Sequence, residues 1–194
     1  MMRKRVRCFK AEGLHWSKLP EFDRQLKGQE SGLNDMTVDE YIKGRTAFDE
    51  GEVTRSSSAA KKARVQYARE LTRDLTDKLQ GEGLSPAQAE QKAIEIASEK
   101  MKTLAALHNP DMVSGGRDVI SDFGDRSVNS SIGAQWGNGR SSRQGDPHNA
   151  AMNLPELERG GKISRLTELD NAARAVPENE RAMTKMNAAL ERCK

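Results

Sequence analysis

The stretch His108–Asn109–Pro110–Asp111 places a histidine three residues before an aspartate, and these two residue types can carry acid–base and metal chemistry. An imidazole exchanges a proton near neutral pH, and a carboxylate oxygen is a ligand that Mg²⁺ accepts. Hydrolysis of a phosphodiester uses both abilities, because a cation neutralises developing charge while a base activates water. Gly115–Gly116 follow closely and could form a nest of backbone N–H groups for a phosphate oxygen. The spacing is short enough to arise by chance, so on its own it makes hydrolysis a hypothesis only.

Further titratable side chains lie on both sides of this motif. Asp118, Asp122 and Asp125 could supply more oxygen ligands to a hard cation, although solvated loops are commonly rich in aspartate. His15 lies in a polar stretch punctuated by glycine and proline, where we expect a structural or surface role. His148 lies in a segment without apolar periodicity, whereas a catalytic site needs rigid support. The functional histidine is therefore expected to be His108.

A well-specified helix is expected immediately before the motif. Ser85 and Gln88 have the spacing of a capping box, and Pro86 between them suits the first helical turn. An apolar stripe at helical spacing then runs through Ile94, Ala97, Met101, Leu104 and His108. Proline disfavours helical geometry in the residue before it. The pattern predicts that His108 ends the helix, that Pro110 breaks it, and that Asp111 lies on the turn beyond.

Other helices are indicated earlier in the chain. Thr37 and Glu40 form a second capping-box pair, and the helix they start should reach about Phe48. Apolar residues recur every four positions from about Ala59 to Leu79, which predicts an amphipathic helix.

The rest of the chain is expected to be less regular. Two short helices are predicted near the end, with apolar stripes over 166–176 and 183–193. Glycine and proline interrupt residues 1–35, and 114–139 reads as loop and short irregular elements. Residues 137–162 are rich in serine, glycine and asparagine, and we expect a mobile insertion there.

The fold class expected from these elements is mainly α with minor β. We expect a single compact helical domain over 1–194, with a long irregular central region. Short strands are predicted from the two termini and from 119–132.

Composition and charge set wider limits on function. Hydrophobic residues make up 35% of the chain, aromatics 4% and charged residues 31%, so a core is expected along only part of it. The net charge of +3 is too small to identify a nucleic-acid partner. Basic residues gather in the N-terminal arm 1–5 and in a later cluster. Each group could be a solvated face or could contact phosphate, and the sequence leaves both roles open. The later cluster comprises Lys61, Lys62, Arg64, Arg69 and Arg73.

Neither a membrane anchor nor a disulfide framework is predicted. No apolar run approaches the length of a membrane span, and no hydrophobic segment follows the N-terminal charges, so we expect no membrane association and no export signal. The doubled Met1–Met2 suggests a domain taken from a longer protein. Cys8 and Cys193 could meet if the termini lie together, but the lack of a CxxC or framework spacing favours two buried free thiols.

Ordered blocks along the sequence resemble the polymorphic toxin type 15 family. The central block contains Ala106–Asp111 followed by Gly115–Gly116. The other blocks are Arg7–Phe9, Phe22–Gln29, Gly32–Tyr41, Gly124–Asp125, Val128–Gly133, Gln135–Trp136, Lys185–Asn187, Leu190 and Arg192–Cys193. Matches in this order from residue 7 to residue 193 are far more specific than the HxxD motif alone. Between Trp136 and Leu166 the chain departs from the family pattern, which agrees with an insertion there.

The resemblance implies a metal-dependent DNase. The resemblance makes His108 and Asp111 the catalytic pair of the HxxD motif. Asp111 is expected to hold a divalent metal, which should be Mg²⁺, and His108 either to join it as a ligand or to activate water. From the residues themselves, and not from the resemblance, Asp122 and Asp125 are candidate additional ligands. Candidate substrate-binding residues are Gly115, Gly116, Asn129, Ser131, Arg24, Gln25 and Lys185.

The resemblance also implies a setting. Such a protein is a bacterial effector, often delivered by type VI secretion, that hydrolyses the DNA of a competitor. It would be made in the bacterial cytoplasm and act in the cytoplasm of a target cell. Its expected partners are DNA, a cognate immunity protein encoded beside it, and delivery components or parent effector domains.

Two other functions stay open on the residues themselves. An RNase toxin would use His108 together with a distant His15 or His148 on either side of a ribose 2′-hydroxyl. A non-catalytic basic interaction module, which would bind an acidic partner without hydrolysing it, suits the polar composition and the basic clusters.

Overall fold

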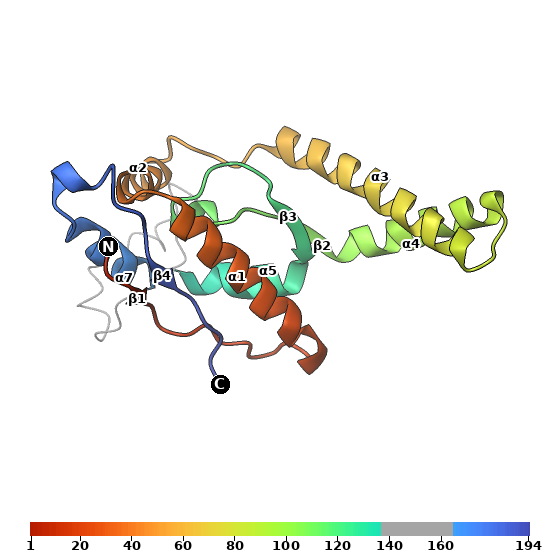
Figure 1. Ribbon diagram of the computed structural model, residues 1–194, viewed down its shortest axis with the longest axis horizontal. Coiled ribbons are helices and arrows are strands. Elements are labelled where there is room, and N and C mark those ends of the chain that lie inside the picture. The colour runs from red at the N-terminus through yellow and green to blue at the C-terminus, as the bar shows by residue number, and fades with distance from the viewer. Residues whose placement is uncertain (137–164) are drawn as a thin grey trace, which may run out of the picture.

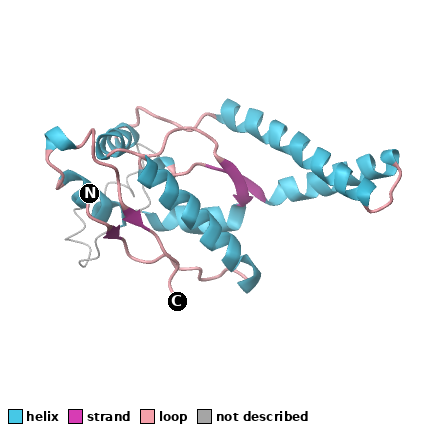
Figure 2. Ribbon diagram, viewed as in Figure 1, coloured by secondary structure: helices cyan, strands magenta, loops and turns pink. Residues whose placement is uncertain are grey.

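The computed structural model describes residues 1–136 and 165–194, so the predicted insertion 137–162 and His148 lie outside the described residues. Helices dominate these two ranges and the strands are short, as Figure 2 shows, which confirms a mainly α fold with minor β. None of the described helices is long and apolar enough to cross a membrane.

The main core lies among helices of the body (Figure 1). These are α1 (Leu19–Asp35), α2 (Val38–Asp49), α5 (Arg126–Trp136) and α7 (Arg165–Arg174). They bury large apolar side chains against one another, including Phe22, Leu26, Leu33, Tyr41, Val128, Ile132, Trp136 and Leu169. The single-turn 3-10 helices are η1 (Trp16–Lys18), η2 (Met112–Ser114) and η5 (Glu178–Glu180).

Two small sheets connect distant parts of the chain. β1 (Lys4–Arg5) pairs in parallel with β4 (Ala188–Ala189) and joins the two ends. β2 (Leu104–Leu107) pairs antiparallel with β3 (Asp122–Asp125) and fixes the segment directly before His108. The strands predicted from the termini and from 119–132 are therefore confirmed.

A long helical hairpin projects from the body (Figure 1). It consists of α3 (Ser57–Gly81) and α4 (Pro86–Thr103), which have a small core of their own around Leu79, Ala89 and Ala93. Ser56 caps α3 by accepting a hydrogen bond from the Ala59 N–H at 3.2 Å. Because α3 begins just after Ser56 and α4 runs directly into β2, the base of the hairpin lies beside the residues that precede His108.

The position predicted for His108 at the end of a helix is wrong. α4 ends at Thr103, and β2 carries the chain from there to the motif. Leu104 and His108 continued the helical spacing only by coincidence, because residues 104–107 pair with β3 and leave the helix. His108 thus comes directly after β2, and the pairing of β2 with β3 fixes the backbone that leads to it.

Two segments expected to be irregular are helices. α1 covers the second half of 1–35, and it buries Phe22, Leu26 and Leu33 along one face. α5 covers Val128–Gly133 and buries Val128, Ile132 and Trp136 four residues apart. The predicted final helix over 183–193 is also wrong, because Ala188–Ala189 form β4 there and Phe9 bridges to Arg192.

Cys8 and Cys193 form a disulfide, so the expectation of free thiols is wrong. Their Cα atoms lie 4.9 Å apart across a sequence separation of 185 residues. The pairing of β1 with β4 and the bridge from Phe9 to Arg192 bring the two cysteines together. Sequence spacing gave no sign of this, because the contact depends on where the chain ends meet.

Candidate active site

His108 lies at the end of β2 with its ring held by an aspartate. The His108 Nε2 atom is 3.0 Å from Asp118 Oδ1, and His108 is only 9% exposed. The other oxygen of Asp118 accepts a hydrogen bond from the Ser56 N–H at 2.8 Å. An ionised carboxylate favours the tautomer that carries its proton on Nε2. The lone pair is then on Nδ1, which makes no hydrogen bond to the described residues.

The environment of Asp118 keeps it ionised. The backbone N–H of Ser56, followed by the hydrogen bond to His108, lowers the pKa of this carboxyl below its usual value. Asp118 is therefore an acceptor throughout the neutral range. It can orient the His108 ring and stabilise a positive charge on it.

Asp111 is buried at the other end of the motif, with 6% exposure. Its Oδ1 atom accepts hydrogen bonds from the Arg55 Nη2 atom at 2.8 Å and from the Val113 N–H at 3.1 Å, so it also caps η2. Its Oδ2 atom accepts none from the described residues. A Cβ added to Gly133 of α5 would lie 4.0 Å from Oδ2, so this oxygen faces a helix surface that carries no side chain at that point.

Glycines of α1 let the motif pack directly on that helix. A Cβ on Gly32 would overlap the carbonyl group of Asn109, and one on Gly28 would lie 2.8 Å from the Asn109 side-chain nitrogen. The peptide bond between Asn109 and Pro110 is cis. These two glycines, which suggested an irregular segment, are helical residues that make room for the motif.

The atoms left without partners suit a divalent cation. Asp111 Oδ2 and His108 Nδ1 are an oxygen and a nitrogen donor of kinds that bind metals. Among the described residues there is no group of three or more His, Cys, Asp or Glu side chains arranged to hold a metal ion. Mg²⁺ usually takes only one or two carboxylates and completes its shell with water and substrate phosphate. Each of the two atoms is thus a donor of a kind that such a cation accepts.

Asp122 and Asp125, the candidate additional ligands, are engaged elsewhere. Asp122 pairs with Arg24. Asp125 pairs with the Lys18 Nζ atom at 3.0 Å and accepts hydrogen bonds from the first turn of α5. Burial opposes ionisation of Asp125, but hydrogen bonds from Ser127 and Lys18 outweigh it and lower its pKa to about 2. The structure gives both carboxylates structural partners, and no hydrogen bond connects them to His108 or Asp111.

The phosphate nest predicted at Gly115–Gly116 is not formed. The Gly115 N–H donates to the Met112 carbonyl at 3.0 Å, and the Gly116 N–H donates to the Asp111 carbonyl at 3.1 Å. Both glycines are buried. Gly115 has a φ of 85°, which ends η2 in the left-handed region. Their role is to close the turn after Asp111, because their donors are already used.

The other candidate substrate-binding residues are scattered. Arg24 is paired with Glu21 and Asp122, and Gln25 is buried with its amide on Glu21 and the Asp125 carbonyl. Lys185 donates to the Asp35 carbonyl at 2.5 Å.

The two candidates on α5 differ from these. Asn129 lies one helical turn before Gly133, on the face of α5 that is turned to Asp111. The Ser131 carbonyl accepts a hydrogen bond from Gln135 at 2.9 Å. By its spacing of one helical turn, Asn129 shares the helix face of Gly133, the α5 glycine whose added Cβ would lie 4.0 Å from Asp111 Oδ2.

Arg55 and Ser56 are the site residues that the sequence did not indicate. They lie in a Ser-rich stretch before α3, and only the folded chain brings them to Asp111 and Asp118. His15, in contrast, caps η1 by accepting from the Ser17 N–H at 3.3 Å and has no contact with the motif.

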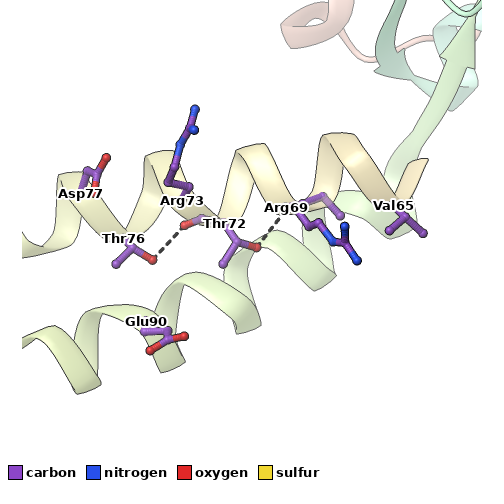
Figure 3. A pocket seen from close by; sticks show the side chains of 8 residues that line it. Val65, Arg69, Thr72, Arg73, Thr76, Asp77 and Glu90 are labelled. Atoms are coloured by element: carbon purple, nitrogen blue, oxygen red, sulfur yellow. Dashed lines mark hydrogen bonds between the residues drawn. The ribbon is translucent and has the colours of Figure 1, made fainter. Parts of the chain in front are cut away.

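A shallow groove between α3 and α4 is a separate feature (Figure 3). Its walls include Val65, Arg69, Thr72, Arg73, Asp77 and Glu90. Figure 3 shows hydroxyls of Thr72 and Thr76 bonded along α3, to the carbonyls of Ala68 and Thr72. Positive and negative side chains are mixed there, and no residue of the motif lines the groove.

Comparison with known proteins identifies one family over most of the chain. A family model described as novel toxin 15 matches residues 17–190. A search of curated proteins finds no match. The matched range includes His108, Asp111, Asp118 and the segment at Arg55–Ser56.

Proposed function

Since the chain belongs to the novel toxin 15 family, we propose that it is an antibacterial effector that hydrolyses target-cell DNA with the help of a divalent metal. The toxin role is that of the family, whereas the DNase activity and the metal are our inference. The observation that carries it is the buried pair on one turn: His108 oriented by Asp118, and Asp111 with a free oxygen.

His108 is assigned the proton transfer. With its Nε2 proton directed to Asp118, its Nδ1 lone pair can accept a proton from the attacking water or bind the metal. Asp118 stabilises the positive charge that the ring gains in the first case and fixes the ring in the second. The neighbouring N–H of Ser56 holds Asp118 in place.

Asp111 is assigned the metal. Its Oδ2 atom would hold the ion, and His108 Nδ1 would be a second donor only where it does not act as the base. When bound, Mg²⁺ supplies charge neutralisation at the phosphate. Arg55, 58% exposed at its side chain, can turn from Asp111 to a phosphate oxygen, because a guanidinium binds either anion in the same geometry.

A nuclease assay with purified protein tests this function. We expect plasmid DNA to be nicked with Mg²⁺ and left intact with EDTA. His108→Ala and Asp111→Ala should abolish cleavage without changing the far-UV circular dichroism spectrum, and His15→Ala, at a histidine away from the motif, is the matched control. Full activity in either motif variant contradicts the site.

Two other outcomes would each replace the DNase proposal. Cleavage of RNA with plasmid untouched would identify an RNase toxin. Tight binding without hydrolysis of either nucleic acid under any metal would identify an interaction module. Expression inside bacteria separates the second case at low cost, because a nuclease is toxic there and a binding module is tolerated.

The biological setting proposed is interbacterial competition. The effector would be made in the cytoplasm of one bacterium, delivered by type VI secretion alone or within a longer effector, and act in the cytoplasm of another. A cognate immunity protein would protect the producer. Loss of toxicity on co-expression of the neighbouring gene product, together with a purified complex of the two, would test this partner.

A further inference from the structure

Gln29 holds both ends of the His108–Asp111 turn with one side chain. Its Nε2 atom donates to the His108 carbonyl at 3.2 Å, and its Oε1 atom accepts from the Asp111 N–H at 2.7 Å. The residue is 3% exposed, so water does not compete for these bonds. Both bonds reach backbone atoms of the two residues that the proposed chemistry uses.

The surroundings make this contact specific. Gln29 lies on α1 between Gly28 and Gly32, the two positions where the helix approaches Asn109 too closely for a Cβ. The amide therefore reaches across a contact in which the motif lies directly on the helix. Just after the turn in sequence, the Val113 carbonyl accepts a hydrogen bond from the Arg45 guanidinium of α2 at 2.7 Å.

We propose that Gln29 is a positioning residue, whose amide fixes the separation and orientation of His108 and Asp111 for hydrolysis. This inference depends on the proposed function. An amide suits the role because it offers a donor to the His108 carbonyl and an acceptor to the Asp111 N–H at once. Neither a carboxylate nor an apolar side chain can do both. Outer residues that orient catalytic groups typically change activity about 10–100-fold when replaced.

Two variants separate the two bonds. Gln29→Glu keeps the acceptor for Asp111 and replaces the donor with a second acceptor that faces the His108 carbonyl. Gln29→Met removes both bonds at similar volume. We expect both to lower kcat about 10–100-fold at saturating DNA, with KM changed less than about threefold, since the residue does not touch substrate.

Asn34 provides a matched control on the same helix. It is also an amide that holds a backbone by two bonds: it donates to the Ala188 carbonyl at 3.0 Å and accepts from the Ala188 N–H at 2.6 Å. Its partner is β4, away from the motif. Asn34→Asp should lower the melting temperature as Gln29→Glu does, and leave kcat close to that of the wild type.

A spectroscopic measurement adds a result that does not depend on activity. The ¹⁵N signals of the His108 ring report its tautomer and its hydrogen bond to Asp118. They should change in both Gln29 variants and stay unchanged in Asn34→Asp.

The outcomes distinguish the two proposals. If the wild-type protein cleaves DNA and the folded Gln29 variants have the same kcat, the positioning role is overturned. An equal loss of kcat in Asn34→Asp also overturns it. Wild-type protein that cleaves no nucleic acid overturns the proposed function instead, and the ring signals then still decide whether Gln29 holds the turn.

Discussion

The Arg55 guanidinium donates a hydrogen bond to the Asp111 carboxylate across 2.8 Å, although 56 residues separate the two in sequence. The side chain of Arg55 is 58% exposed and that of Asp111 is 9% exposed. The ion pair thus joins the long, exposed arginine side chain to a buried carboxylate. It places a positive charge where both a divalent cation and a phosphate would need to come.

Arg55→Ala is predicted to change metal affinity and turnover in opposite directions. Without the guanidinium, no positive side chain competes with a cation for Asp111. The Mg²⁺ affinity should therefore rise by up to about fivefold, which corresponds to the free energy of a partly exposed ion pair. The kcat should fall because the phosphate loses a positive partner. Calorimetric titration with Mn²⁺ and Mg²⁺-dependence of cleavage measure the two effects. A parallel loss of affinity and kcat contradicts the competition.

Asp118→Asn tests how far the orientation of His108 matters. The amide is neutral and can donate as well as accept, so the ring is no longer held in one tautomer. We expect kcat to fall about 10–100-fold while KM changes little. Asp23→Asn is the control, because Asp23 lies on α1 in an exposed pair with Arg192 at 2.8 Å. Retention of full kcat by Asp118→Asn would show that His108 works without this partner.

The helices of this fold were predictable where local signals determine them. The capping boxes at Thr37 and Ser85 correctly marked the starts of α2 and α4, and the apolar repeat marked α3. α1 was missed because Gly28 and Gly32 resemble helix breakers, whereas their purpose is contact with Asn109. That contact joins segments far apart in sequence, so no local pattern contains it.

The residues of the candidate site could be proposed from a motif, whereas their arrangement could not. The spacing of His108 and Asp111 is visible in the sequence, and both residues lie within the matched range 17–190. Their partners Gln29, Arg55 and Asp118 come from α1, the approach to α3 and the loop before β3. Which of many polar residues reach the motif depends on tertiary packing. For the same reason the sequence cannot show that Asp122 and Asp125 are engaged in ion pairs with Arg24 and Lys18.

Asp125 is predicted to stabilise the protein in a defined pH range. Its pKa of about 2 in the folded state lies below the unfolded value of about 3.9. A lowered pKa gives stability that is present above pH 4 and is lost as the pH falls toward 2. Asp125→Ala removes a helix cap and should cost about 1 kcal/mol at pH 7, a difference that shrinks between pH 4 and pH 2. Thermal unfolding at pH 7, 4 and 2.5 measures it.

Asp74→Ala is the control for this acid effect, because Asp74 lies on α3 with its side chain 70% exposed. Its melting temperature should follow that of the wild type at each pH. A difference between Asp125→Ala and wild type that stays constant down to pH 2.5 contradicts the assignment.

Lys62 is predicted to contact the DNA backbone. It is exposed near the start of α3, shortly after Arg55, and the described residues offer it no ion pair. Lys62→Glu should raise KM and reduce the slope of log KM against log salt by about 1, as expected for one lost phosphate contact. Lys92→Glu makes the same charge change on α4 near the tip of the hairpin. Equal salt slopes for the two variants would assign the effect to net charge.

Reduction of the Cys8–Cys193 disulfide is predicted to lower stability and to spare the chemistry. The bond closes a loop of 185 residues, and loss of such a link typically costs about 2–4 kcal/mol, through a less constrained unfolded chain. No hydrogen bond or ion pair connects either cysteine to His108 or Asp111 within the described residues. The melting temperature should therefore fall on treatment with a reducing agent, by about as much as in the variant with both cysteines changed to serine. At 25 °C, where the protein stays folded, kcat should be unchanged. A reduced protein that keeps its melting temperature, or that loses activity while folded, would contradict this division between stability and catalysis.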